Sequence, residues 1–259
     1  MRMVSRLWVL VKRELFQLVS FKTLLIAQII QPAAWLILYS LGMTDLVQPF
    51  LYCGVPVRYI DFVLPGLVAL QGFSQLAYTL SRVADEKRHG MFQALLTSGV
   101  DQAQYVLAKA SSAVLIASLQ CLGIVGVFFL AMDSESTALK LTPHVFILTV
   151  MGAILWSSLG TALGTALCSA EKSSVVAALV GLPVMFSSSV FYDLEGAHAV
   201  LKSLSAANPL TFYVGALRKS MLFGGINPRE YLILGLLTAC SFLVACWVVG
   251  ATDLVTKEK

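Results

Sequence analysis

The stretch RVADEKRHGMFQALLTSGVDQAQYVLAK, residues 82–109, decides the fold because it is the most polar internal part of the chain. Five charged side chains gather at its start, and long apolar runs lie on both sides of it. Charge at this density is too costly to bury in a bilayer. We therefore expect this polar segment to face water between two membrane spans.

The polar segment has an internal order of its own. Gly90 follows the charges, a short amphipathic piece covers Met91–Leu96, and Thr97-Ser98-Gly99 breaks it. Asp101 stands at the N-cap position of a new helical pattern, which continues toward Lys109. This order predicts a compact element on which a soluble partner pushes. An ordinary solvated loop between two spans is the alternative.

The composition places the rest of the chain in a membrane. Of the 259 residues, 58% are hydrophobic and 12% are charged, whereas a soluble domain carries about 25% charged residues. We expect an all-α integral membrane protein that forms a single transmembrane domain over residues 1–259. The net charge of +4 does not indicate a nucleic-acid partner. The five cysteines have no metal-ligand spacing, and we expect no disulfide.

The apolar runs predict six membrane spans, each of roughly 20 residues. They cover about 22–43, 59–81, 106–132, 142–168, 174–191 and 231–251. In the fourth span Gly160 and Gly164 stand four residues apart, a spacing that allows close helix packing.

Residues 3–20 predict an amphipathic helix that lies in the membrane interface. Its apolar stripe consists of Val4, Leu7, Trp8, Val11, Leu15 and Leu18. Its expected water-facing side consists of Arg6, Arg13, Gln17 and Ser20. A signal peptide is excluded because the charged region is long and no small-residue cleavage site follows.

Residues 192–230 are too polar for a simple span and too apolar for a free loop. Val200, Leu201 and Leu204 mark one short helix, and Asn208-Pro209 ends it. A second short helix follows, and Gly224-Gly225 ends that one. Two broken helices predict a re-entrant or external hairpin before the last span.

The distribution of basic residues predicts the orientation of the chain. Six spans place both termini on one side, together with the polar segment. Twelve of the 18 Lys and Arg residues lie on that side, and the other six lie on the opposite side. The positive-inside rule therefore places both termini and the polar segment in the cytoplasm.

The chain carries no recognisable catalytic or nucleotide motif. It has no Gly-x-x-x-x-Gly-Lys-Ser/Thr phosphate loop and no His-Glu-x-x-His, and its three histidines are scattered. Almost no ionisable residue falls inside a predicted span, which disfavours an ion-driven carrier. We expect no enzyme activity, no metal and no cofactor in this chain.

Uncharged polar residues do fall inside two of the predicted spans. They are Gln28 and Gln31 in the first, and Gln71, Ser74 and Gln75 in the second. Each glutamine pair shares one helix face. They could line a path for an amphipathic substrate, or they could form hydrogen bonds between helices.

Several segments, in this order and spacing, carry a family resemblance over nearly the whole chain. They are YIDFVLPG at 59–66, EKRHGMFQALL at 86–96, YVLAK at 105–109, and NPLTFY at 208–213 with Ala216-Leu217-Arg218. The chain resembles the permease subunit of type-2 ATP-binding cassette exporters. One departure is Thr97-Ser98-Gly99-Val100, where many relatives have a proline after a small residue.

The resemblance implies a coupling role for the polar segment. Its loop, 82–105, would dock into a groove of a separate ATPase subunit that holds ATP and Mg²⁺. The implied coupling residues are Glu86, Arg88, Gly90, Met91, Phe92, Leu95, Leu96 and Gly99. We expect Phe92 to be the central contact of an apolar face, with Glu86 and Arg88 at its rim.

The resemblance also implies the assembly and the function. Two copies of the chain would pair with two ATPases, and membrane lipid would surround them. The first, second and fifth spans would line the path, and the hairpin with Asn208, Pro209, Tyr213 and Arg218 would cap it outside. The expected function is ATP-driven export of a drug, lipid, glycolipid or polysaccharide across the cytoplasmic (inner) membrane. A membrane anchoring or assembly factor without transport is the alternative.

Overall fold

The computed structural model describes residues 2–20, 22–43, 48–131, 139–167, 170–194 and 196–257. Within these ranges the chain is mostly helical, with one two-stranded antiparallel hairpin. In chain order the elements are α1 (Arg2–Ser20), α2 (Lys22–Met43), β1 (Phe50–Tyr52), β2 (Val55–Val57), α3 (Tyr59–Arg88), α4 (Met91–Thr97), α5 (Gln102–Ala131), α6 (Pro143–Ala166), α7 (Ala170–Phe186), α8 (Ala199–Ala207), α9 (Pro209–Phe223) and α10 (Pro228–Lys257).

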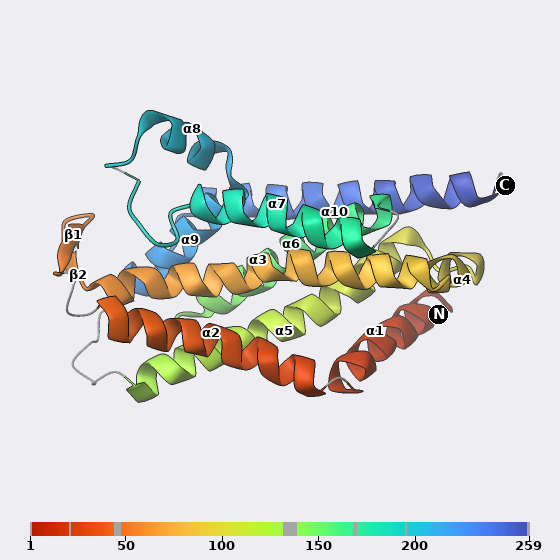
Figure 1. Cartoon of the computed structure of the whole chain (residues 1–259), viewed down its shortest axis with the longest axis horizontal. Coiled ribbons are helices and arrows are strands. Elements are labelled where there is room, and N and C mark those ends of the chain that lie inside the picture. The colour runs from red at the N-terminus through yellow and green to blue at the C-terminus, as the bar shows by residue number, and fades with distance from the viewer. Residues whose placement is uncertain are drawn as a thin grey trace.

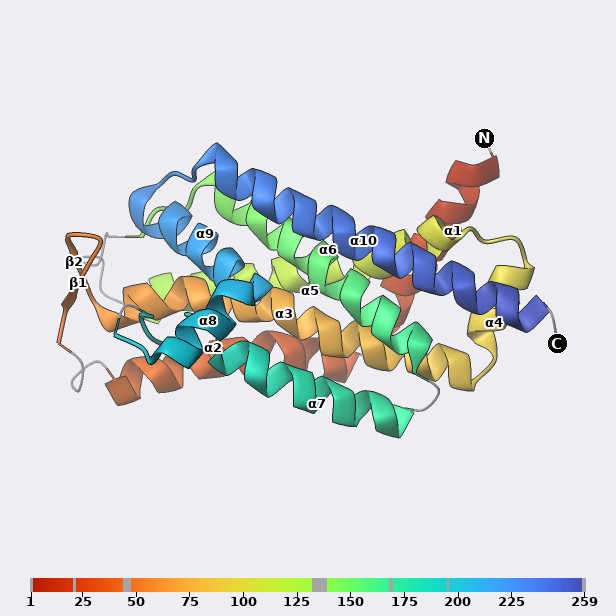
Figure 2. The same ribbon diagram turned by 90° about the horizontal axis from the view of Figure 1, so that it is seen from above.

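The helices form an elongated bundle with two distinct ends (Figure 1). Both termini and α4 lie at one end, and the β1–β2 hairpin and α8 lie at the other. The view from above shows the same arrangement, with α1 set at an angle to the bundle beside the α4 end (Figure 2). We call these the α4 end and the hairpin end.

Among the described residues, four helices are long and apolar enough to cross a membrane: α3, α5, α6 and α10. Shorter apolar stretches lie in α2 and α7, at Ile26–Leu38 and Val175–Phe186. These helices also run lengthwise along the bundle (Figures 1 and 2). The predicted span ends at Met132 and Cys168 lie outside the described residues.

Helix α3 is the centre of the bundle, and it packs most extensively against α6. Gly160 and Gly164 make this contact possible. A Cβ atom at Gly160 would lie 2.5 Å from the Leu76 carbonyl oxygen, and one at Gly164 would lie 2.7 Å from that of Leu80. The close packing predicted from their spacing is therefore confirmed at this interface.

Three local features differ from the expectations. The charges from Arg82 to Arg88 stand on the last two turns of α3, because the helix continues past the predicted span end at Ser81. Helix α7 ends at Phe186, before the predicted end at residue 191. The predicted loop between the first two spans contains the β1–β2 hairpin, whose strands of three residues are too short to show a periodic pattern.

Candidate functional site

The α4 end holds the residues that the sequence marks as a docking element. Gly90 adopts the positive φ that its place in a turn predicts, 71°, and Gly99 adopts 81°. These turns start and end α4, the short helix expected over Met91–Leu96. The Asp101 carboxylate accepts a hydrogen bond from the backbone N–H of Ala103 at 3.2 Å, which confirms it as the cap of α5.

The orientation of α4 corrects the expected role of Phe92. The Phe92 side chain is 1% exposed, and its ring packs edge-on against the Tyr105 ring at 5.3 Å between centroids. Leu96 is also buried, and Leu95 is half-buried. The apolar face of α4 therefore points into the bundle, because Val83, Tyr105 and Val106 offer it a core to pack against.

The outward face of α4 carries a different set of residues. Met91 is 41% exposed. Ala94, Thr97, Ser98 and Gly99 are exposed as well, and so is Arg88 at the end of α3. A partner that approaches this end would meet Met91 and Ala94 before it met Phe92.

Next to α4 lies a charge cluster that consists of Arg13, Glu14, Glu86, Tyr105 and Lys109. Arg13 is half-buried, and the other four side chains are buried. The Lys109 ammonium donates to a Glu86 oxygen at 2.7 Å and to a Glu14 oxygen at 2.9 Å. Arg13 donates to the same Glu86 oxygen at 2.7 Å, and the Tyr105 hydroxyl donates to the other at 2.7 Å. Two acids and two bases thus neutralise one another where α1, α3 and α5 meet.

This cluster corrects two expectations. Glu86 is 7% exposed and binds neighbouring helices, so it is not a charge at the rim of a docking surface. Arg13 and Gln17 face the bundle rather than water, since Gln17 accepts a hydrogen bond from Arg82. The side chains of α1 that point away from the bundle include Trp8 and Phe16, which are 65% and 72% exposed.

The charges of the cluster perturb one another. Burial by itself raises the pKa of Glu14, but the neighbouring Lys109 and Arg13 outweigh it and lower that pKa below its ordinary value. Burial lowers the pKa of Arg13, but the hydrogen bond that Arg13 donates to Glu14 and the charge of Glu86 raise that pKa overall. Both shifts favour the charged forms, so Arg13 and Glu14 are ionised at neutral pH.

Glu14 was missed by the sequence reasoning, although a signal was present. It is the only acidic residue among the first 44, and Leu10 and Leu18 stand four residues to either side of it. In the structure these two leucines and Glu14 form one buried face of α1. An acid on the buried face of a helix needs a basic partner, and only the fold shows that Lys109 supplies it.

Further contacts tie the α4 end together. Arg6 of α1 donates to the Gly99 carbonyl oxygen at 2.7 Å, in the turn between α4 and α5. Lys87 of α3 donates to the carbonyl oxygens of Thr165 and Leu167, where α6 ends. Each connects elements that lie far apart in the sequence.

The polar residues proposed for a substrate path are split between two environments. Gln71 and Gln75 are buried, whereas Gln31 and Ser74 are exposed. Gln75 donates to the Gln120 side chain at 3.2 Å, and Gln120 donates to the Gln28 carbonyl oxygen at 3.0 Å. These bonds join α2, α3 and α5, so Gln75 takes part in hydrogen bonding between helices.

The hairpin end contains the residues expected in the external hairpin. Asn208 caps α9 through the Leu210 N–H at 2.9 Å, and Pro209 occupies the first turn of that helix. The Tyr213 ring lies against Gly72 of α3 and Gly152 of α6. Arg218 is 2% exposed, and its guanidinium carbon lies 3.6 Å from the centre of the Phe62 ring.

Arg218 remains a cation in this buried position. Burial lowers its pKa, and Tyr52 and the carboxylate of Asp193 oppose that shift. Arginine stays protonated in proteins even after such a shift, so its hydrogen-bond donors remain in place.

The family follows from a comparison with known proteins. Residues 5–222 match the model of the ABC-2 type transporter family. The chain belongs to this family. The match covers α1, the polar segment and the Asn208–Arg218 motif, and it ends in α9 before the last long helix.

A relative agrees with this membership. The ABC-2 chain is 26% identical over 223 residues to a protein of Cyanophora paradoxa named "Putative transport permease ycf38". The alignment covers 83% of this chain and 73% of the relative. The comparisons therefore show a membrane transport permease, and permeases of the ABC-2 family usually pair with a separate ATPase subunit.

Proposed function

We propose that this chain is the permease subunit of an ATP-driven exporter in the cytoplasmic membrane, with a hydrophobic or amphipathic substrate. The ATPase, with its ATP and Mg²⁺, is a separate subunit that docks on the outward face of α4. Two copies of the chain form the complete membrane part. Both termini and α4 face the cytoplasm, in agreement with the excess of basic residues on their side.

The observation that carries this proposal is the connection between α4 and the charge cluster. Phe92 packs on Tyr105, and the Tyr105 hydroxyl binds Glu86. The Lys109 ammonium of α5 donates hydrogen bonds to both Glu86 of α3 and Glu14 of α1. A push on α4 is therefore transmitted directly to α5, α3 and α1, through groups that are costly to separate once buried.

The proposed six-span arrangement rests on helix length and direction. Helix α2 has 22 residues and spans about 33 Å, and α7 has 17 residues and spans about 25 Å. The hydrocarbon core of a bilayer is about 30 Å thick. Both helices run alongside the four longer ones, which favours six crossings (Figure 2).

The docking surface is tested by exchanging an exposed residue of α4. We expect Met91→Glu to weaken ATPase binding by about 2 kcal/mol, roughly thirtyfold in Kd, because a charge replaces an exposed apolar contact. The measurement is co-purification of an ATP-binding cassette ATPase with the tagged permease from membranes of its own host. The amount of permease in the membrane is measured in parallel.

Two control variants separate docking from folding. Val200→Glu makes the same change in charge at an exposed apolar position of α8, at the hairpin end, and leaves ATPase recovery unchanged. Phe92→Ala removes a buried ring and lowers the amount of folded permease, because such truncations cost about 3–5 kcal/mol. Equal ATPase recovery with Met91→Glu and wild type contradicts docking on this face. The absence of any captured ATPase favours the anchoring or assembly alternative.

A further inference from the structure

The segment Ser187–Leu194, which we call the strap, follows α7 at the hairpin end and forms neither helix nor strand. Its centre is buried, since Ser188 and Val190 are 0% exposed and Ser189 is 8% exposed. Irregular backbone at such a position has carbonyl oxygens that no helix or sheet satisfies, and leaving them unpaired is costly. The strap therefore depends on donors from elsewhere in the fold.

Side chains supply those donors. Arg218 Nη2 donates to the Ser189 carbonyl oxygen at 2.7 Å and to the Val190 carbonyl oxygen at 3.4 Å. The Tyr59 hydroxyl donates to the Phe191 carbonyl oxygen at 3.2 Å. At the start of the strap, Asn208 donates to the Ser187 hydroxyl at 2.9 Å.

Arg218 also binds the surface on which the strap lies. Its Nε donates to the Phe62 carbonyl oxygen of α3 at 3.2 Å. A Cβ atom at Gly66, one helical turn further along α3, would lie 2.7 Å from the Val190 carbonyl oxygen. The strap thus rests on the α3 backbone itself, and one guanidinium joins strap, α3 and α9.

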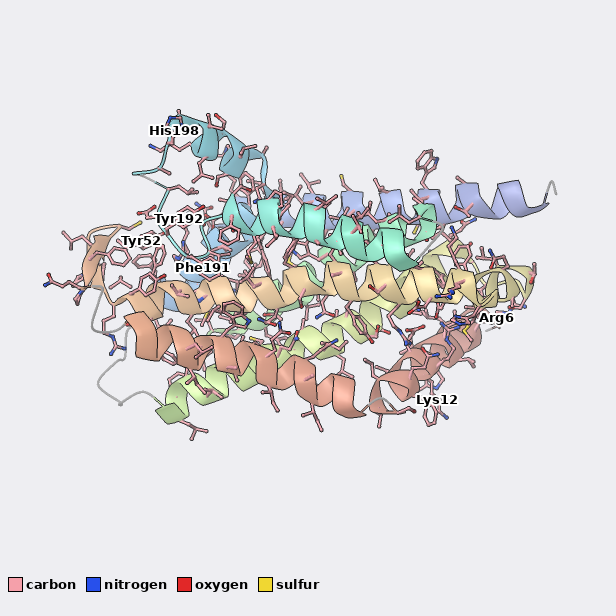
Figure 3. The ribbon with its side chains drawn as sticks, viewed as in Figure 1. Arg6, Lys12, Tyr52, Phe191, Tyr192 and His198 are labelled. Atoms are coloured by element: carbon pink, nitrogen blue, oxygen red, sulfur yellow. The ribbon has the colours of Figure 1, made fainter. Side chains whose placement is uncertain are left out.

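The β1–β2 hairpin covers this contact. The guanidinium carbon of Arg218 lies 3.6 Å from the Phe62 ring centre and 5.6 Å from that of Tyr52. Tyr52 in turn packs edge-on against Phe62 at 5.3 Å. Figure 3 shows Tyr52, Phe191 and Tyr192 at this end of the molecule.

We propose that the strap is a releasable closure of the hairpin end, and that Arg218 is the positioning residue that holds it on α3. The bonds from Arg218 and Tyr59 are all from side chain to backbone, so the strap can leave α3 without breaking any helical hydrogen bond. The planar fork of arginine donates toward α3 and toward the strap at the same time. Lysine carries its donors on one nitrogen and cannot replace that geometry.

The closure acts at the end of the bundle opposite α4. In the proposed exporter it would control the end away from the ATPase, and this consequence rests on the proposed function. The hold of Arg218 on the strap is a property of the chain alone. It is therefore tested on the purified permease, without ATPase, substrate or knowledge of the membrane orientation.

The experiment measures how fast a water-soluble maleimide reacts with Ser188→Cys, in a background in which the five native cysteines are replaced by serine. We expect slow labelling when Arg218 is present. Arg218→Met should raise the rate at least about tenfold, as expected for the loss of one hydrogen bond to a charged group. Arg218→Lys should give a rate between the two.

A second reporter distinguishes strap release from general loosening. This reporter is Val145→Cys, near the start of α6, where the native Val145 side chain is 3% exposed. In Arg218→Met, the labelling rate of Val145→Cys should stay within about twofold of its rate when Arg218 is present, because the strap does not hold α6. A parallel rise at both reporters overturns the proposal, and so does an unchanged rate at Ser188→Cys in Arg218→Met.

Tyr59→Phe keeps the test valid if Arg218→Met does not fold. This variant removes only the hydroxyl that binds Phe191. We expect Tyr59→Phe to raise the labelling rate of Ser188→Cys by less than Arg218→Lys does. Equal rates in wild type, Tyr59→Phe and Arg218→Lys contradict a closure held by these side chains.

Discussion

At the scale of single residues, the fold assigns roles that residue type alone does not reveal. Glu14 belongs to an amphipathic helix, yet it is 2% exposed and binds Lys109 of α5. Phe92 belongs to a short polar segment, yet it fills a core position against Tyr105. Both side chains connect α4 and α1 to the bundle, so their loss affects folding.

The charge of Glu14 makes the stability of the permease depend on pH. Its folded-state pKa lies below the ordinary value of 4.5, so its stabilising effect is present above that pH and is lost as the pH falls through the folded pKa. We expect Glu14→Gln to be less stable than wild type by about 1–3 kcal/mol at neutral pH. The difference should shrink as the pH falls below 4.5.

Thermal unfolding of the detergent-solubilised chain at several pH values measures this effect. Asp85→Asn, at an exposed position of α3, is the matched control and should differ little from wild type at any pH. A difference between Glu14→Gln and wild type that is constant across the pH range would contradict the role assigned to the Glu14 charge.

At the scale of elements, the bundle depends on how closely its helices approach. Helices α3 and α6 come together where α6 has glycine, and α9 fits Tyr213 into the space left by Gly72 and Gly152. Small residues are the common means of packing helices in membranes, where no hydrophobic effect drives them together. The contact between α3 and α6 therefore leaves no room for a larger side chain at Gly160 or Gly164.

Gly160→Ala tests this contact. The added Cβ atom would lie 2.5 Å from the Leu76 carbonyl oxygen, so α3 and α6 must separate. We expect a loss of about 1–3 kcal/mol in unfolding free energy, the usual cost of overpacking. The measurement is the melting temperature of the purified permease.

The matched control is Gly126→Ala in α5, where a Cβ atom would meet no atom within 4 Å. This variant should be as stable as wild type or slightly more stable, because alanine favours a helix. The same melting temperature for both variants would show that the close approach of α3 and α6 does not limit stability.

At the scale of the whole molecule, the two ends of the bundle are built from different elements and contacts. The α4 end holds the charge cluster and both termini, and the hairpin end holds Arg218, the strap and α8 (Figure 1). In a bilayer these ends face opposite sides when the long helices cross it. The orientation then determines which end a cytoplasmic partner can reach.

Single-cysteine labelling of intact cells tests the orientation. We expect Ser98→Cys to react only from the cytoplasm and Lys202→Cys only from outside, because both positions are exposed at opposite ends of the bundle. The native cysteines are removed first, since Cys53 and Cys240 are exposed. Labelling of Lys202→Cys from the cytoplasm would overturn the six-span arrangement.

The sequence by itself determined the local features of this protein. Long apolar runs predicted the helices, because a backbone in lipid must satisfy its own hydrogen bonds. Gly90, Gly99, Asp101 and Asn208 predicted turns and caps, because those depend on the backbone preferences of one residue and its neighbours.

Only the tertiary structure decided which faces of these helices meet. Lys109 stands 95 residues from Glu14, and Arg218 stands 156 residues from Phe62. No periodicity relates such pairs, so the burial of Phe92, the charge cluster and the donors of the strap could not be predicted. They follow from the packing of α3 against its neighbours, which places polar groups where they must pair or remain unsatisfied.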